Sequence, residues 1–464
     1  MTHPLPLSDT KILEVGNALA VPLATRFLAD MGADVIKVES LQRPEVGRGI
    51  THPGGKPGAK AWETGGFYQE ANRNKSGITL NLDTEKGRTT LSKLVEHCDV
   101  VVENYAPRVM ANWGIDYEWL RQFRDDVIYL SSSGFGQTGP WREYRAYGMT
   151  LAPTAGLSHF TGYADSAPVK NVISYTDSPA AMMNAFAIMC AIEHRSVTGK
   201  GQRIDSSQYE IGVSLIAEGL IAAQVSPEST GRDGNQDPIF APHNVYPCDG
   251  EAGEWIAIAV STDPEWRSLC RVLGITDQAQ DQRFLTVSQR WQNREPLDEL
   301  VASHTVAFER LDLQYQLQEA GVPAGAVNDV RDLFFDPQLR ATAFFEQVDH
   351  PDSVPEFGAR VYPGAMWSTS RFGRPHLRCP APTLGQHNEP VLRNVAGITT
   401  TELQELEEEA IIGSEPTLSR AMNERYLTIP EMMDRGMVIA SDPDYQSNLQ
   451  AIASESRERD AHGL

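Results

Sequence analysis

The sequence predicts an α/β domain built on a parallel sheet, followed by a smaller α+β region. Patterns typical of buried strands and of helices alternate through the first half of the chain, as they do where helices connect parallel strands. With 464 residues, the chain exceeds the size that one hydrophobic core usually supports, so two domains with extensions are expected. Its composition, 41% hydrophobic and 22% charged, is that of a globular protein.

The alternation begins with a βαβ unit. Residues 11–15 (KILEV) are typical of a buried strand, residues 22–31 of a helix and residues 33–39 of the next strand. Because ligands bind at the carboxyl ends of such strands, the small-residue loop at 16–22 is a candidate binding site. Its alternative role is a plain connection.

The segment 41–70 is rich in glycine, proline and charge, and we expect it to be a long surface segment. The sheet pattern then resumes. We expect a returning strand within 72–82, a helix at 84–96 and strands at 99–103 and 127–133.

A glycine-rich turn follows the last of these strands, where Gly134, Gly136 and Gly139 match the pattern G-x-G-x-x-G. A dinucleotide fingerprint would need a helix next, then a strand that ends in an acidic residue about 20 residues on. Pro140 and Trp141 interrupt that pattern instead. The turn therefore disfavours an NAD-dependent oxidoreductase and favours a site where backbone approaches a ligand.

The rest of the chain is organised around residues 171–205. A short β-like run at 171–175 leads to Asp177, and the Pro179 that follows is a helix-start signal. Residues 180–192 are nearly all apolar or small, so we expect this helix to be enclosed by protein on most sides. It ends at the glycines of TGKGQ (198–202), and a strand follows.

Asp177 has two readings at this position. Asp before a helix is commonly an N-cap, which stabilises by ~1 kcal/mol. Alternatively, the helix dipole and free N–H groups hold a functional carboxylate in its charged form. The residues of this stretch alone leave both readings open.

After a helix at 208–225, the composition changes. We expect a large domain from residues 1–225 and 355–413, a linker at 226–243, a small domain at 244–340, a second linker at 341–354 and an acidic extension at 414–464. The extension carries no motif to which we assign chemistry.

Charge and cysteine usage limit the partners. A net charge of -22 argues against nucleic acid or an anionic membrane. The five cysteines are scattered and form no CxxC pair, the start shows no signal-peptide pattern and no apolar run would span a membrane, so we expect a cytoplasmic protein. The histidines show no metal-ligand spacing, so no metal site is predicted.

Taken together, several stretches resemble the class III CoA-transferases, the family of formyl-CoA transferase and carnitine CoA-transferase. The resemblance covers roughly residues 10–400. Its motifs are LAVPLATRFLADMGADVIKVE (19–39), NRNKSGITLNL (72–82), DVVVENYAP (99–107), GFGQTGP (134–140), the Asp177 region, TGKGQ (198–202), GVPAGAV (321–327) and PTLGQHNEPVL (382–392).

The resemblance implies a Rossmann-like large domain plus a smaller α+β domain, in ring-like subunits that interlock as a homodimer. It also implies an enzyme that moves CoA from an acyl-CoA donor to a free carboxylic acid, with no tightly bound cofactor. Asp177 falls on the family's catalytic aspartate, which forms a mixed anhydride and then an aspartyl-CoA thioester. The backbone of Gly134, Gly136 and Gly139 is a candidate source of oxyanion donors.

Family correspondence also implies the residues that contact CoA. Leu19 and Ala20 belong to the loop that contacts it, and Asn104 and Tyr105 lie along it. Arg145 and Tyr147 are expected near its phosphates and reactive end, although Arg145 is alternatively a solvated surface charge. Lys75 is a further candidate of the same kind.

Some positions depart from the family pattern. Val21 stands where glycine is usual, Ser40 replaces a common basic residue, and Arg108 replaces another glycine. The glycine-rich lid loop has no evident counterpart within residues 230–253. These departures affect how CoA is bound, and they leave the class unchanged.

Two alternatives share the fold. An α-methylacyl-CoA racemase would need a Gly-His-Asp segment where this chain has Arg145-Ala146-Tyr147, so no histidine is available for proton exchange there. A non-catalytic CoA-binding subunit has no reason to keep Asp177. The donor and acceptor acids cannot be read from the sequence.

Overall fold

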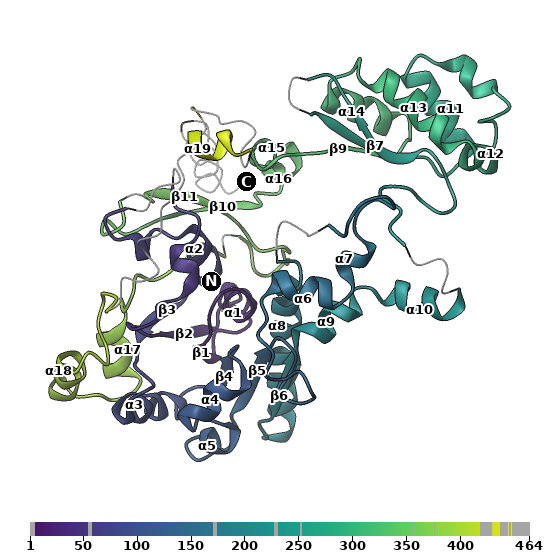
Figure 1. The fold of residues 1–464 in the computed structure, drawn as a ribbon. Coiled ribbons are helices and arrows are strands. Elements are labelled where there is room, and N and C mark those ends of the chain that lie inside the picture. The colour runs from purple at the N-terminus through teal and green to yellow at the C-terminus, as the bar shows by residue number, and fades with distance from the viewer. Residues whose placement is uncertain are drawn as a thin grey trace. The chain divides into compact units, whose positions relative to one another are not determined.

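The computed structural model describes residues 5–53, 58–169, 174–226, 231–250, 253–355, 357–374, 376–417 and 429–436, together with 444 and 447. Residues 171–173 of the expected strand and most of the 414–464 extension fall outside the described residues, and the described residues 174 and 175 lie in no strand. The chain divides into two compact units (Figure 1). Unit 1 contains residues 1–157, 170–220 and 337–464, and unit 2 contains residues 158–169 and 221–336.

Unit 1 is built on a six-stranded sheet in which every neighbouring pair of strands is parallel, in the order β3-β2-β1-β4-β5-β6. The strands are β1 (Lys11–Val15), β2 (Asp34–Glu39), β3 (Ser76–Thr79), β4 (Val100–Glu103), β5 (Ile128–Ser133) and β6 (Arg203–Ser207). This sheet confirms the α/β class and the Rossmann-like order. The direction of winding reverses between β1 and β4, which is where such sheets bind ligands.

Helices cover both faces of the sheet (Figure 1). Helix α10 (Ala217–Val225) begins in unit 1 and continues into unit 2. In chain order, the other helices of unit 1 are α1 (Ala20–Asp30), α2 (Gly66–Asn72), α3 (Glu85–Val95), α4 (Pro107–Trp113), α5 (Tyr117–Arg121), α6 (Gly148–Thr154), α8 (Asp177–Thr198), α9 (Gln208–Ser214), α16 (Pro337–Ala341), α17 (Asn388–Asn394), α18 (Thr400–Glu408) and α19 (Ile429–Asp434). The helix expected at 208–225 is therefore interrupted between α9 and α10. A hairpin of β10 (Phe345–Asp349) and β11 (Ala359–Pro363) completes the unit.

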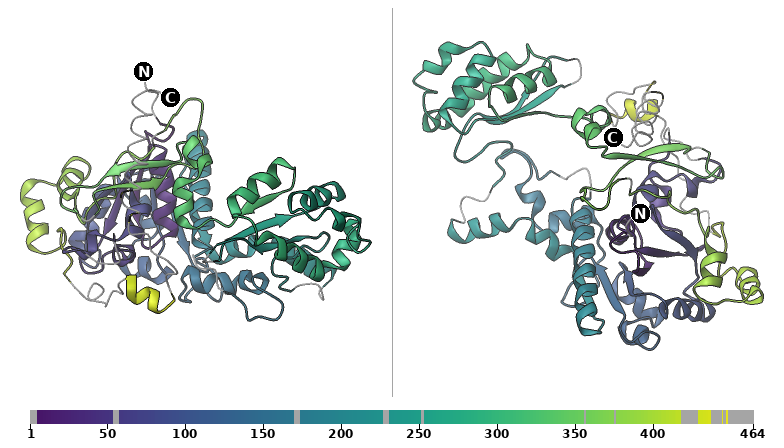
Figure 2. Two further views of the ribbon diagram at one scale, coloured as in Figure 1. Left: turned by 90° about the horizontal axis from the view of Figure 1, so that it is seen from above. Right: turned by 180° about the vertical axis from the view of Figure 1, so that it is seen from behind.

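Two hydrophobic cores lie on opposite faces of this sheet. On one face α1 and α8 lie side by side and pack on strand residues such as Ile12, Val100 and Leu130. The other face is covered by α3, α4, α5, α17 and α18, which pack on Leu13 and Val101. Figure 2 shows both layers from two further directions. Helices α17 and α18 thus pack on the first domain, where the PTLGQHNEPVL motif (382–392) was expected to return.

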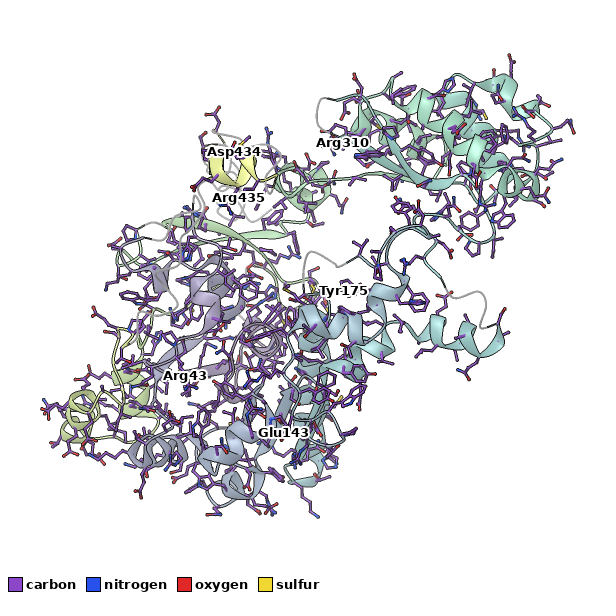
Figure 3. All side chains as sticks on the ribbon, viewed as in Figure 1. Arg43, Glu143, Tyr175, Arg310, Asp434 and Arg435 are labelled. Carbon is purple, nitrogen blue, oxygen red and sulfur yellow. The ribbon has the colours of Figure 1, made fainter. Side chains whose placement is uncertain are left out.

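Unit 2 has its own core and its own antiparallel sheet, with strands in the order β7-β8-β9. Its elements are α7 (Leu157–Phe160), β7 (His243–Pro247), β8 (Trp255–Ala259), α11 (Asp263–Val272), α12 (Val287–Gln292), α13 (Arg294–Thr305), α14 (Arg310–Glu319), β9 (Ala324–Ala326) and α15 (Val330–Phe335). Arg310, labelled in Figure 3, donates to Asp332 at 2.8 Å and so ties α14 to α15. Among all described residues of the chain, no helix is long and apolar enough to cross a membrane.

Two expectations about burial are wrong. The segment 41–70 is not a surface excursion, because Arg48 is fully buried and donates to both carboxylate oxygens of Glu39 at 2.8 and 2.7 Å. The same guanidinium pairs with Glu63 at 2.8 Å and stacks over Tyr68. These partners lie in the segment itself and on β2, so composition alone could not show that they meet.

Helix α8 is also less enclosed than expected. Its buried face is narrow and consists mainly of alanine, so the helix packs closely on the sheet and on α1. Its opposite face is apolar and exposed, with side chains of Met182, Met183, Phe186 and Met189 that are 46–61% accessible. We call these four residues the α8 stripe.

Beneath the 16–22 loop lies a buried cluster of charges. Lys37 pairs with Glu14 at 2.8 Å and with Glu45 at 2.5 Å, and Lys75 pairs with Glu14 at 2.8 Å. Burial raises the pKa of Glu14, but the two ammonium groups more than offset this, and the pKa lies at about 2. Lys37 also donates to the carbonyl of Gly16 at 3.1 Å, so the cluster holds the start of the loop.

We expect Lys37→Met to lower the free energy of unfolding by about 3–5 kcal/mol, because it leaves buried carboxylates uncompensated. Lys11→Met is the matched control, since Lys11 pairs with Asp34 between the same two strands but at a partly exposed position. It should cost no more than about 1 kcal/mol. Urea unfolding followed by circular dichroism measures both, and equal losses would contradict the structural role assigned to the cluster.

Candidate active site

The carboxyl edge of the sheet gathers the starts of two helices. Helix α1 connects β1 to β2 and α8 precedes β6, so each runs antiparallel to the parallel strands and begins at the carboxyl edge. The two helices pack side by side, which brings the start of α1, with Leu19 and Ala20, and the start of α8, with Asp177, to this one edge. Tyr175, labelled in Figure 3, lies just before α8 and is exposed.

Asp177 is the first residue of α8, and its N-cap is Thr176. The reading of Asp177 as the N-cap residue is therefore wrong. Its side chain is half-buried and accepts a hydrogen bond from Ser174. Burial raises the pKa of the Asp177 carboxyl to about 6, although the bond from Ser174 lowers it. The group is thus ionised at neutral pH but poorly solvated, which suits a nucleophilic carboxylate.

Gly148, the first residue of α6, faces this carboxyl directly. A Cβ atom built on Gly148 would lie 2.5 Å from Oδ2 of Asp177 and 2.7 Å from Cβ of Ser174. The Thr176 hydroxyl donates to the Gly148 carbonyl at 3.4 Å, which ties the two helix starts together. Because glycine has no side chain, the backbone of α6 can lie against the carboxyl of Asp177.

The glycine turn at 134–139 is connected to the Gly148 region through a contact between Gly134 and Ala146. A Cβ on Gly134 would lie 2.7 Å from Cβ of Ala146, two residues before Gly148. Gly136 and Gly139 both have positive φ angles, 83° and 86°, which side chains rarely adopt. The structure thus brings Gly134 toward Asp177. It places Gly136 beside Asp205, in the middle of β6, and a Cβ on Gly139 would meet no atom of the chain within 4 Å.

Asn184 fixes the position of α8, and sequence reasoning missed it. Its Nδ2 donates to the Ser132 hydroxyl on β5 at 3.0 Å, and its Oδ1 accepts from the Ser206 hydroxyl on β6 at 2.6 Å. Asn184 is fully buried two helical turns after Asp177. The available signal was a lone amide in an otherwise apolar helix, because such a group needs partners when buried.

Asn104 locks the 16–22 loop to the end of β4. Its Nδ2 donates to the carbonyl of Asn17 at 2.7 Å, and its Oδ1 accepts from the N–H of Asn17 at 2.8 Å. The next residue, Ala18, has a φ of 62°, an uncommon conformation for a residue with a side chain. The structure therefore brings Leu19, Ala20 and Asn104 together where β1 and β4 diverge.

Tyr105 is held beside Asn104. Its backbone N–H donates to Glu103 at 2.7 Å, and its ring meets Trp113 edge-on with ring centres 5.7 Å apart. Burial raises the pKa of its hydroxyl to about 12.

Lys75 does not fit the phosphate contact predicted for it. Its Nζ donates to Glu14 at 2.8 Å, to the Pro22 carbonyl at 2.7 Å and to Asn72 at 2.9 Å. An ammonium group has three N–H donors, so none is left for a phosphate. The structure therefore corrects this expectation: Lys75 belongs to the charged cluster beneath the loop.

Arg145 and Tyr147 lie next to Gly148 and are exposed, with Tyr147 75% accessible. Tyr147 is the N-cap residue of α6, where its backbone N–H donates to the Thr150 hydroxyl oxygen at 3.1 Å. Among the described residues, no group of three or more His, Cys, Asp or Glu side chains is placed to hold a metal ion. The site thus consists of one carboxylate, glycine-rich backbone and exposed polar side chains.

The chain belongs to CoA-transferase family III, whose sequence model matches residues 7–388. Among its relatives, the succinyl-CoA–D-citramalate CoA-transferase of Chloroflexus aurantiacus is 33% identical over 419 residues, which cover 88% of this chain and 98% of the relative. The succinate–glutarate CoA-transferase of Agrobacterium fabrum is 32% identical, with 85% of this chain and 97% of the relative covered.

A solved structure agrees. The crystal structure of a CaiB/BaiF family protein from Brucella suis has a TM-score of 0.76 and 31% sequence identity, and the match covers 85% of this chain and all of that one. The chain is therefore an enzyme, a CoA-transferase of family III, and its mixed α/β fold is confirmed.

The contact at Gly148 gives a test of the site. We expect Gly148→Ala to lower kcat about a hundredfold, because the new methyl group would push the Asp177 carboxyl aside by about 1 Å or more. Gly373→Ala is the matched control, since a Cβ at Gly373 would meet no atom of the chain within 4 Å. Steady-state kinetics measures kcat of both variants, and a melting curve shows whether each is folded. Full activity of a folded Gly148→Ala enzyme would show that this contact does not position the carboxyl.

Proposed function

We propose that the enzyme transfers CoA by covalent catalysis on Asp177. The observation that carries this proposal is the Asp177 carboxyl itself: ionised at neutral pH, half-buried at the carboxyl edge and packed against a glycine backbone. A carboxylate that is partly removed from water is a stronger nucleophile than a solvated one, and glycine at position 148 leaves the carboxyl room to change its bonding.

The proposed steps keep every atom in balance. Asp177 attacks the thioester carbonyl of the donor acyl-CoA, which forms a mixed anhydride and releases CoA as a thiolate. The thiolate attacks the aspartyl carbonyl, which frees the donor acid and leaves an aspartyl-CoA thioester. The acceptor carboxylate then attacks the aspartyl carbonyl and releases the thiolate again, and the thiolate takes the acceptor acyl group to regenerate Asp177. Splitting the exchange in this way replaces one difficult step by several easier ones.

CoA binding is proposed at the sheet edge where β1 and β4 diverge. Leu19 and Ala20 at the start of α1 and Asn104 and Tyr105 after β4 would line its path. Arg145 and Tyr147 would meet its phosphates and reactive end, since a guanidinium suits bidentate phosphate contact. The backbone of Gly134, Gly136 and Gly139 is the proposed source of oxyanion donors, and Gly134 contacts Ala146, two residues before the Gly148 that faces Asp177.

The names of the relatives suggest the substrates. The names of the Chloroflexus and Agrobacterium relatives pair succinyl-CoA with citramalate and succinate with glutarate. We therefore propose succinyl-CoA as donor and a short dicarboxylic acid as acceptor. The five cysteines, all within described residues, are free, which supports the expected reducing cytoplasm.

The covalent step can be tested directly. After incubation with succinyl-CoA, hydroxylamine or borohydride should trap an adduct on the Asp177 peptide that mass spectrometry detects. Asp177→Ala should lose this adduct and lower kcat about a thousandfold or more, because the nucleophile is gone. Asp125→Ala removes an exposed aspartate and should behave as wild type. Wild-type turnover without any label at Asp177 would defeat the mechanism.

The α8 stripe supports the expected homodimer. Four exposed apolar side chains gather on one helix face, and contiguous exposed apolar patches commonly mark interaction sites. We therefore propose that a second copy of the chain covers Met182, Met183, Phe186 and Met189.

Phe186→Glu should weaken dimerisation about thirtyfold or more, because it would bury an unpaired charge. Tyr315→Glu is the control, since it places the same charge at an exposed aromatic position in unit 2. Light scattering coupled to gel filtration reports the mass of each variant. A wild-type protein with the mass of one chain at micromolar concentration would rule the dimer out.

A further inference from the structure

Glu103 is a buried carboxylate at the end of β4, and the mechanism above does not use it. It is 2% exposed, and its position is the sheet edge where the proposed CoA path begins. Among the described residues, no lysine, arginine or histidine forms an ion pair with it. A buried carboxylate without a cation is costly, so the structure around it must supply hydrogen bonds.

Three donors converge on the two oxygens of Glu103. The Tyr105 N–H donates to Oε2 at 2.7 Å, while the Tyr129 hydroxyl donates to Oε1 at 3.3 Å. The Ser131 hydroxyl also donates to Oε1. Ser131 in turn accepts from the Gln137 amide at 2.6 Å, and the Gln137 N–H is held by Asp205 at 3.0 and 3.1 Å. We call Glu103, Tyr129, Ser131 and Gln137 the Glu103 cluster.

The Glu103 cluster connects two segments of the proposed site. One end is the backbone of Tyr105, beside Asn104, and the other is Gln137, in the middle of the glycine turn. We propose that Glu103, in its ionised form, is a positioning residue that couples the CoA-binding segment at Asn104 and Tyr105 to the glycine turn. This inference rests on the proposed CoA path and does not depend on the covalent step at Asp177.

Hydrogen-bond accounting explains why the ionised form is required. A carboxylate only accepts, and here it accepts three bonds. A protonated Glu103 carries a proton on one oxygen, and the donors that face that oxygen, either the Tyr105 N–H at Oε2 or the hydroxyls at Oε1, would then have to turn away. Because Tyr105 belongs to the CoA-binding segment and Ser131 carries the link to Gln137, protonation would loosen the connection at one of its two ends.

The surroundings of Glu103 place the ionisation of its carboxyl near neutral pH. Burial raises the pKa of Glu103 to about 7, although the bonds from Ser131, Tyr105 and Tyr129 and the charge of Arg203 lower it. The titratable groups that face the cluster are Tyr105 after β4, Tyr129 on β5 and Arg203 and Asp205 on β6, with Tyr117 of α5 stacked on Tyr129. The pKa values of both Tyr105 and Tyr129 are raised by burial, so these hydroxyls stay protonated over the range in which Glu103 titrates.

Stability and binding should then respond to pH in opposite directions. A carboxyl whose pKa is raised in the folded state contributes stability that is complete below its ordinary pKa of 4.5 and is lost as pH rises through about 7. CoA binding should instead improve over the upper part of that range, as Glu103 ionises. A purely structural residue would not separate the two effects.

The test compares full-length wild type, Glu103→Gln and Glu96→Gln, the last a control at an exposed carboxyl in the same unit. Calorimetry with free CoA gives the affinity of each from pH 6 to pH 8.5. At pH 8, Glu103→Gln should bind CoA about tenfold more weakly than wild type, because a neutral amide cannot accept all three bonds. At pH 6 the ratio should approach one, and titration of the CoA phosphates cancels in this ratio.

Two further readouts complete the test. Glu103→Gln should melt at the same temperature as wild type at pH 8, or higher. Ser131→Ala removes one donor, so the midpoint of the pH dependence should shift to higher pH. A pH-independent affinity ratio, a lower melting temperature of Glu103→Gln at pH 8 or an unshifted midpoint in Ser131→Ala would each overturn the inference. Trapping at Asp177 in wild type reports separately on the covalent mechanism, which can fail while these binding results stand.

Discussion

The two hydrogen bonds of Asn184 fix the position of α8, and with it the position of Asp177. They join α8 to β5 and β6 inside an apolar core, where an unpaired amide would be expensive. Alanines around Asn184 let the helix lie close to the sheet, so these bonds fix its rotation as well as its height. The start of α8 then has one position relative to the strand ends, and the Asp177 carboxyl comes to rest on the backbone of Gly148. The Asn184 amide therefore positions the Asp177 carboxyl, two turns earlier in the helix.

Three buried or half-buried carboxyl groups of unit 1 differ mainly in their partners. Glu14 has two ammonium groups, and its pKa falls to about 2. Asp177 has only a serine hydrogen bond, and burial raises its pKa to about 6. Glu103 has neutral donors and a more distant guanidinium, and its pKa rises to about 7. The cations thus pair with Glu14 in the cluster beneath the loop, whereas Asp177 and Glu103 at the sheet edge lack such a partner and have pKa values near neutral pH. Because the chain has a net charge of -22, acidic residues outnumber basic ones, and only some carboxylates can have a cation as partner.

Most of the sheet could be predicted because its signals are local. Strands such as residues 11–15 and 127–133 are short apolar runs, and the Asp177 helix begins with a proline signal. The errors concern partners far away in sequence. Arg48 is buried because it also donates to the carbonyl of Pro382, 334 residues later, and Lys75 is neutralised by Glu14. Family resemblance assigned Lys75 a ligand role, but only the folded contacts show that its donors are already used.

The opposing pKa shifts also determine how these three carboxyl groups contribute to folding stability at different pH values. The stability that Glu14 contributes is present above its ordinary pKa and is lost only as pH falls through about 2. The contributions of Asp177 and Glu103 run the other way, complete in acid and lost as pH rises through about 6 and 7. At neutral pH both edge carboxylates therefore destabilise the fold, while the charged cluster beneath the 16–22 loop is at full strength. Within one sheet, the ion pairs beneath the loop thus offset the cost of the desolvated carboxylates at its edge.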